Sequence, residues 1–69
     1  MDCDEAKAIA TLDMTRKGVK NCRNLKCCLI EEAGMWNLVY VCNVQQNVSG
    51  NFRVYLIDND TGQIRVSVP

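Results

Sequence analysis

The chain has 69 residues, of which 48% are hydrophobic and 23% are charged, and its formal net charge is zero. This length gives a single small domain over residues 1–69, and the composition is that of a globular chain rather than a disordered one. The balanced charge excludes a protein that acts as a polycation over its whole surface. A core this small is marginal, so a partner or a second copy is expected to supplement it.

The first predicted element is a helix over residues 3–17. Asp2 and Glu5 have the spacing of a capping box, with Asp in place of Ser or Thr. Good helix formers and an apolar stripe follow, and Gly18 stands where a left-handed residue ends a helix. These signals predict both ends of the helix.

The rest of the chain alternates with the period of β-strands. In the second predicted strand, Trp36, Leu38 and Tyr40 share an apolar face with Cys42 and Val44. Short connections make neighbouring strands antiparallel. The predicted fold class is α+β, with one N-terminal helix packed on a three- to four-stranded antiparallel meander in two layers. The predicted strands cover residues 25–32, 36–44, 52–58 and 63–68.

Residues 58–62 (DNDTG) resemble a calcium loop at first sight. Asp58, Asp60 and Gly62 copy its first half, but the twelfth position, where a bidentate Glu is needed, is Pro69. Asp and Asn also open turns through hydrogen bonds to the backbone, and glycine supplies positive φ. We therefore expect a hairpin turn here and no metal.

The five cysteines are odd in number, and the N-terminus has neither the basic nor the apolar region of a secretory signal. This pattern predicts free thiols in a reducing cytoplasm. The spacing of Cys22, Cys27 and Cys28 lacks zinc knuckles, and adjacent Cys27 and Cys28 point to opposite faces of a strand. We expect packed cysteines without metal or cofactor. The full set is Cys3, Cys22, Cys27, Cys28 and Cys42.

The chemistry of the chain argues against an enzyme. It contains no histidine, so the commonest general base and metal ligand are absent. No cysteine has a histidine base beside it, so no catalytic residue is predicted. No apolar run approaches the length of a membrane span, so no membrane partner is expected.

Two surfaces are candidates for partner binding. Val39 and Val41 lie on the strand face that the helix leaves uncovered, and a protein partner or a homodimer is expected there. The matching outward set on the third strand is predicted to be Arg53, Tyr55 and Ile57. The alternative is a nucleic acid held by a basic run with no acid between Asp13 and Glu31. That run consists of Arg16, Lys17, Lys20, Arg23 and Lys26.

Three short segments carry a resemblance to known families. Residues 5–10 (EAKAIA), Trp36 and residues 57–64 (IDNDTGQI) stand in the places of the helix, strand and turn motifs of PepSY-type domains. A family of small bacterial toxin-immunity proteins is similar at the same places, including a GN pair at residues 50–51. The resemblance implies one helix on a curved antiparallel meander. It also implies a protein that acts by surface contact, without a catalytic residue.

Overall fold

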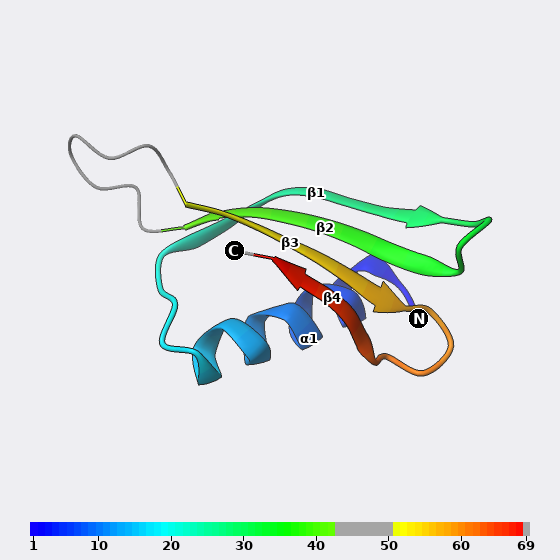
Figure 1. The fold of residues 1–69 in the computed structure, drawn as a ribbon, viewed down its shortest axis with the longest axis horizontal. Coiled ribbons are helices and arrows are strands. Elements are labelled where there is room, and N and C mark those ends of the chain that lie inside the picture. The colour runs from blue at the N-terminus through cyan, green and yellow to red at the C-terminus, as the bar shows by residue number, and fades with distance from the viewer. Residues whose placement is uncertain (43–50, 69) are drawn as a thin grey trace.

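The computed structural model describes residues 1–42 and 51–68. Its strands form one antiparallel sheet in the order β1-β2-β3-β4, and the helix packs on one face of that sheet (Figure 1). The predicted two-layer α+β fold is therefore confirmed. The predicted loop 45–50 and the predicted strand residues 43–44 lie outside the described residues. The elements are α1 (Cys3–Arg16), β1 (Cys22–Ile30), β2 (Met35–Cys42), β3 (Asn51–Asp58) and β4 (Ile64–Val68).

Both ends of α1 carry the caps that the sequence predicts. The Asp2 carboxylate accepts a hydrogen bond from the Glu5 backbone N–H at 2.8 Å, and the Glu5 carboxylate accepts one from the Asp2 N–H at 3.2 Å. At the other end Gly18 has φ +74°, and the Val19 N–H reaches the Met14 carbonyl at 2.9 Å. This Schellman ending satisfies carbonyls that would otherwise be unpaired.

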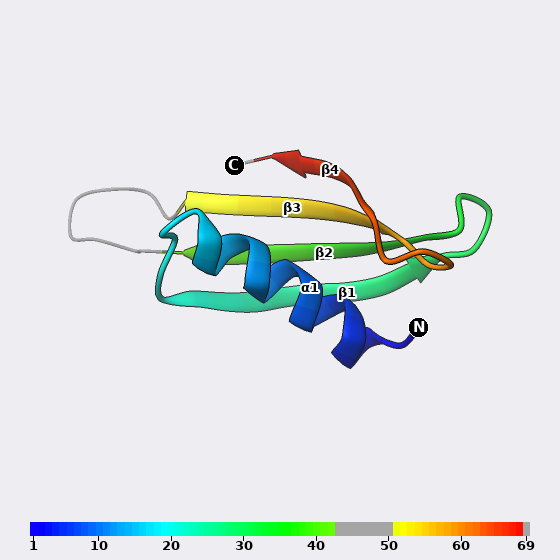
Figure 2. The same ribbon diagram turned by 90° about the horizontal axis from the view of Figure 1, so that it is seen from below.

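The core lies between α1 and the inner face of the sheet. Ala6 and Ala10 are fully buried, and their small side chains let the helix approach the strands closely. Figure 2 shows α1 lying obliquely across β1 and β2. Strand β4, at the other edge of the sheet, lies outside the part that the helix covers. The Tyr55 hydroxyl donates a hydrogen bond to Asp13 at 2.6 Å, which ties β3 to the helix. The buried cluster comprises Ala6, Ala10, Met14, Leu38, Tyr40, Cys42, Tyr55 and Ile57.

Strand β1 begins earlier than predicted, at Cys22 rather than at Leu25. Its register with β2 shifts between Asn24 and Lys26, where a bulge interrupts the alternation. Because a bulge hides the period-two pattern, the first residues of β1 do not read as a strand in the sequence. The turn predicted at residues 33–34 is present, and Gly34 adopts φ +65° there.

Two disulfides join four of the five cysteines, so the expectation of free thiols is wrong. Cys3 of α1 bonds to Cys27 of β1, with 6.2 Å between their Cα atoms. Cys22 bonds to Cys42, its direct neighbour across β1 and β2, with 4.0 Å between Cα atoms. Cys28 remains a free thiol. The two disulfides tie the helix and the start of β1 to the sheet, which offsets the marginal core.

The two core tyrosines give a matched test of the Tyr55–Asp13 hydrogen bond. Tyr55→Phe removes that bond, and we expect it to lower the free energy of unfolding by about 1–2 kcal/mol. Tyr40 is 4% exposed, and its hydroxyl has no partner in hydrogen-bond geometry among the described residues. Tyr40→Phe should therefore be neutral or stabilising. Urea denaturation of both variants checks this, and equal losses would contradict the assignment.

The disulfide pairing predicts a simple labelling pattern. Alkylation of the denatured, unreduced protein should add one label, at Cys28, while alkylation after reduction should add five. The Cys3–Cys27 bond closes a separation of 24 residues, so replacing both with Ser should lower the unfolding free energy by about 3 kcal/mol. Cys28→Ser is the control and should change stability little. Three or more labels without reduction would show that the assigned bonds do not form.

Candidate functional site

The outer face of the sheet, opposite α1, is strongly apolar. The β2–β3 register places Val41 beside Phe52 and Val39 beside Val54, and the β3–β4 register places Val54 beside Val68. These side chains alternate with Leu38, Tyr40 and Tyr55 of the helix side, so they share the face turned away from the helix, although Val41 itself is only 9% exposed. By the cross-strand pairing, the outer face comprises Arg23, Lys26, Cys28, Ile30, Met35, Asn37, Val39, Val41, Phe52, Val54, Leu56, Asp58, Val66 and Val68.

Several side chains of the outer face are open to solvent. Phe52 is 54% exposed, and Val66 and Val68 are 41% and 46% exposed. In Figure 1 the helix lies below the sheet, and none of the labelled elements lies on the upper side. A contiguous apolar surface of this kind is typical of an interaction site. The outer face is therefore the strongest candidate among the described residues.

The prediction for the third strand is wrong, because Arg53, Tyr55 and Ile57 do not face outward. Tyr55 and Ile57 are 0% exposed, and the register sets all three beside core residues of β2 on the helix side. Both alternating sets of this strand are largely apolar, so its phase cannot be read from hydrophobicity. Val39 and Val41 lie on the outer face as predicted.

The structure does not gather the basic run on one face. Arg23 and Lys26 pair with Val41 and Val39, so they lie along the β1 border of the outer face. Lys17 follows α1 on the opposite side, where its Nζ contacts Asp13 at 2.9 Å and donates to the Ser67 hydroxyl at 3.1 Å. The other two basic residues, Arg16 and Lys20, are exposed on the helix side and in the connection to β1.

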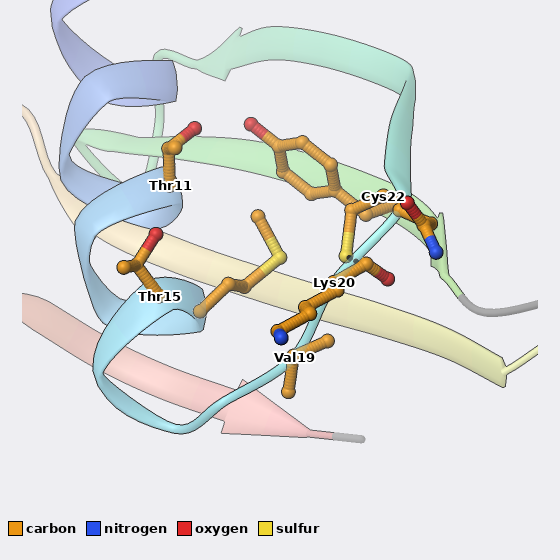
Figure 3. Close-up of a pocket in the computed structure, with 8 residues that line it drawn as sticks. Thr11, Thr15, Val19, Lys20 and Cys22 are labelled. Atoms are coloured by element: carbon orange, nitrogen blue, oxygen red, sulfur yellow. Dashed lines mark hydrogen bonds between the residues drawn. The ribbon is translucent and has the colours of Figure 1, made fainter.

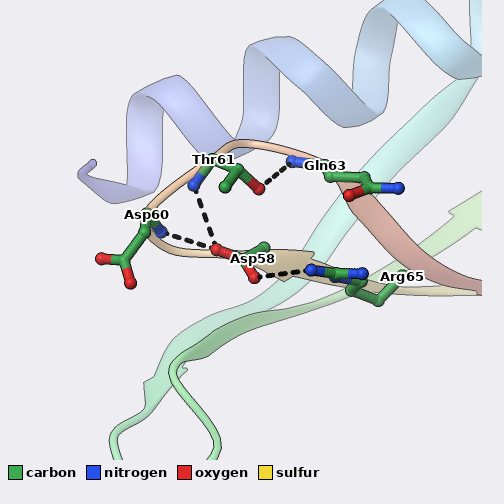
Figure 4. Close-up of polar contacts among 5 residues, drawn as sticks. All are labelled: Asp58, Asp60, Thr61, Gln63 and Arg65. Atoms are coloured by element: carbon green, nitrogen blue, oxygen red, sulfur yellow. Dashed lines mark hydrogen bonds and ion pairs between the residues drawn. The ribbon is translucent and has the colours of Figure 1, made fainter.

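In the turn at residues 58–62, the Asp58 carboxylate accepts hydrogen bonds from the backbone of the turn itself (Figure 4). The Asp58 carboxylate accepts the backbone N–H groups of Asp60 at 2.8 Å and Thr61 at 3.0 Å, and it pairs with Arg65 at 3.3 Å. These backbone hydrogen bonds, more than Arg65, lower the pKa of Asp58. The predicted turn is confirmed, and within residues 1–42 and 51–68 no cluster suited to a metal ion is found.

A pocket of about 330 Å³ lies between the end of α1 and the start of β1 (Figure 3). Its polar lining includes Thr11, Thr15 and Lys20, while Cys22 in its wall is held in a disulfide. Burial raises the pKa of Tyr40, which also lines the pocket. The pocket thus offers hydroxyls and one ammonium group but no activated nucleophile, and it is a weaker candidate than the outer face.

Comparisons of the chain with protein-family models, with curated proteins and with solved structures find no match. The outer face is therefore interpreted from its own residues. No helix in the described part of the chain is long and apolar enough to cross a membrane.

The Asp58 turn predicts a loss of stability in acid. The folded-state pKa of Asp58 lies below its ordinary value of 3.8, so its contribution is present above about pH 4 and is lost as pH falls through the lower folded value. Asp58→Asn should therefore flatten the decline of the unfolding free energy below pH 4. Asp60→Asn, whose side chain points away from the turn in Figure 4, is the control and should leave the decline unchanged. Denaturation curves between pH 2 and 7 give the comparison, and an unchanged acid slope in Asp58→Asn would refute this assignment.

Proposed function

We propose that the protein is a small, non-catalytic protein-binding module that acts through the outer face of its sheet. The observation that carries this proposal is the apolar surface around Phe52, Val66 and Val68. Polar and charged side chains, including Arg23 and Lys26, border it along β1. An apolar centre with a polar border is the usual anatomy of a protein interface.

The side-chain chemistry supports binding rather than catalysis. The chain has no histidine, and four of its five thiols are held in disulfides. The Asp58 carboxylate is engaged by its own turn. Asp13 is likewise engaged, by Tyr55 and Lys17. Asp13, Asp58 and the four disulfide-bonded cysteines thus stabilise the fold.

The two disulfides favour an oxidising compartment over the cytoplasm expected from the sequence. Intracellular thiols are normally kept reduced, whereas small exported domains use disulfides to supplement a limited core. Both disulfides here join segments of just such a core, α1 to β1 and β1 to β2. We therefore place the module in an oxidising environment.

An inhibitory role of the immunity-protein type is a specific form of this proposal. It draws on the resemblance in the helix and turn motifs, which implies action by stoichiometric contact. The nucleic-acid alternative has less support, because Arg23 and Lys26 lie on the opposite side of the sheet from Lys17. A phosphate backbone would need such cations on one continuous surface.

Site-specific photo-crosslinking in the host cells tests the proposal. A photoreactive phenylalanine replaces Phe52 on the outer face in one variant and Leu12 on α1 in the other. These two side chains are 54% and 51% exposed, so the positions are matched in accessibility. We expect a discrete protein adduct at position 52 and none at position 12, because the interface covers only the outer face.

The mass of the adduct separates the forms of the proposal. An adduct at position 52 that is identified as another polypeptide supports a heterologous partner, and one of twice the chain mass supports self-association. If position 52 gives no adduct, or gives the same adducts as position 12, the outer face is not a protein interface. An adduct with nucleic acid would favour the basic-run alternative.

A further inference from the structure

We propose that Asn59 is an N-glycosylation site that carries an oligosaccharide in the native protein. Residues 59–61 (NDT) form the acceptor sequence of this modification, which is Asn, then any residue except Pro, then Ser or Thr. In a reducing cytoplasm such a motif carries no sugar, but the two disulfides are typical of an exported chain. The inference goes beyond the binding function and rests on the placement of the chain in an oxidising compartment.

The acceptor sequence lies in the turn between β3 and β4, at one end of the sheet (Figure 1). Asp60 and Thr61 are exposed there. The backbone N–H of Asn59 donates to the carbonyl of Gly34 at 2.9 Å, and a Cβ added at Gly34 would meet no atom within 4 Å. The surface beside Asn59 is therefore open enough to hold a sugar.

The side chain of Asn59 is held by its oxygen, and its nitrogen is left unpaired. Oδ1 accepts a hydrogen bond from the Trp36 indole N–H at 2.7 Å. Because the indole can only donate, this contact fixes which end of the carboxamide faces Trp36. Nδ2 makes no hydrogen bond within residues 1–42 and 51–68, and it is absent from the buried polar atoms that lack a partner there. Nδ2, the atom to which an N-linked sugar is attached, is therefore open to solvent.

Glycosylation replaces one hydrogen of the Asn59 carboxamide with a sugar. The donor is an oligosaccharide joined through pyrophosphate to a polyprenyl lipid. The bond between the sugar C1 and the phosphate oxygen breaks, its electron pair leaves with the lipid pyrophosphate, and C1 bonds to Nδ2. Nδ2 gives up one proton to a base of the transferase. Oδ1 is not altered, so it still accepts the Trp36 N–H, and the modified side chain fits the folded turn.

A sugar on Asn59 leaves the proposed interface uncovered. Phe52 lies near the start of β3 and Val68 at the end of β4, whereas Asn59 follows the end of β3. At about 3.3 Å per residue of extended chain, Asn59 is roughly 23 Å from Phe52 along the strand. The sugar and a protein partner on the outer face are therefore compatible on one molecule.

Mass spectrometry of the native protein isolated from its host cells tests the inference. Peptide-N-glycosidase in heavy-oxygen water releases the sugar and converts the modified Asn to labelled Asp, so a peptide map locates the site. We expect an intact mass above that of the polypeptide and a label at Asn59. An unlabelled Asn59 overturns the inference, as does a label confined to Asn47, which begins the other acceptor sequence of the chain.

Two substitutions of Thr61, both expressed in the host cells, separate the acceptor sequence from the fold. Thr61→Ala removes the acceptor sequence but keeps Asn59 and its contact with Trp36, so position 59 should lose its sugar completely. Thr61→Ser keeps the acceptor sequence and is the matched control, which should retain the sugar. Equal occupancy of position 59 in the two variants would overturn the assignment.

The Trp36 indole reports on the geometry of the modified side chain. Its N–H should exchange with deuterium at the same rate in the glycosylated protein and in Thr61→Ala, because the sugar and the indole use different atoms of Asn59. Nuclear magnetic resonance follows this exchange directly. Faster exchange in the glycosylated protein would show that the sugar displaces the indole, which overturns the site as described.

The outcomes for this site and for the proposed function are separable. An unmodified Asn59 in a protein that contains both disulfides overturns the inference and leaves the binding function intact. A sugar at Asn59 together with no adduct at position 52 supports the inference while the binding function fails. A host protein with five free thiols contradicts the oxidising placement, and the inference fails with it.

Discussion

The structure depends on one geometric constraint, which is that a single helix covers only one face of a four-stranded sheet. The helix is held at close range by Ala6 and Ala10 and is tied down by the Cys3–Cys27 disulfide and the Tyr55–Asp13 hydrogen bond. The helix thereby buries the centre of the inner face, where Leu38, Tyr55 and Ile57 are 0% exposed. The strands are nevertheless apolar on both sides, so the outer face retains hydrophobic surface that the chain itself does not cover within its described residues. Two apolar faces and only one covering helix leave the outer face available to a partner.

Features that depend on local chemistry were predictable from the sequence. The capping box, the glycine ending of α1 and the turns near Gly34 and Gly62 use short-range hydrogen bonds and positive φ, which residue identity determines. Features that depend on pairing between distant segments were not. The disulfides require the β1–β2 register, and the start of β1 is hidden by its bulge. No local signal in the chain carries that information.

The candidate site was predicted in part for the same reason. The phase of β2 was correct because its inner set, with Leu38 and Tyr40, is more apolar than its outer set. The phase of β3 was wrong because both of its sets contain large apolar side chains. A one-residue change of phase exchanges the core and the surface of a strand. In this chain the wrong phase predicted that Tyr55 would face outward, although Tyr55 is buried. It also left Phe52, which is exposed, out of the predicted outer set.

The adjacent residues Cys27 and Cys28 leave β1 on opposite faces, and only Cys27 lies on the side of Cys3. A bond from Cys3 to Cys28 would require β1 to turn over, which would set its core-facing residues toward solvent. The cysteine to which Cys3 is bonded, Cys27 or Cys28, therefore depends on which face of β1 lay toward the helix when the thiols were oxidised. If the thiols are oxidised while β1 is turned over, the product is an isomer with a Cys3–Cys28 bond. In that isomer Cys27 is the neighbouring thiol, and its attack on the mispaired bond restores the native strand.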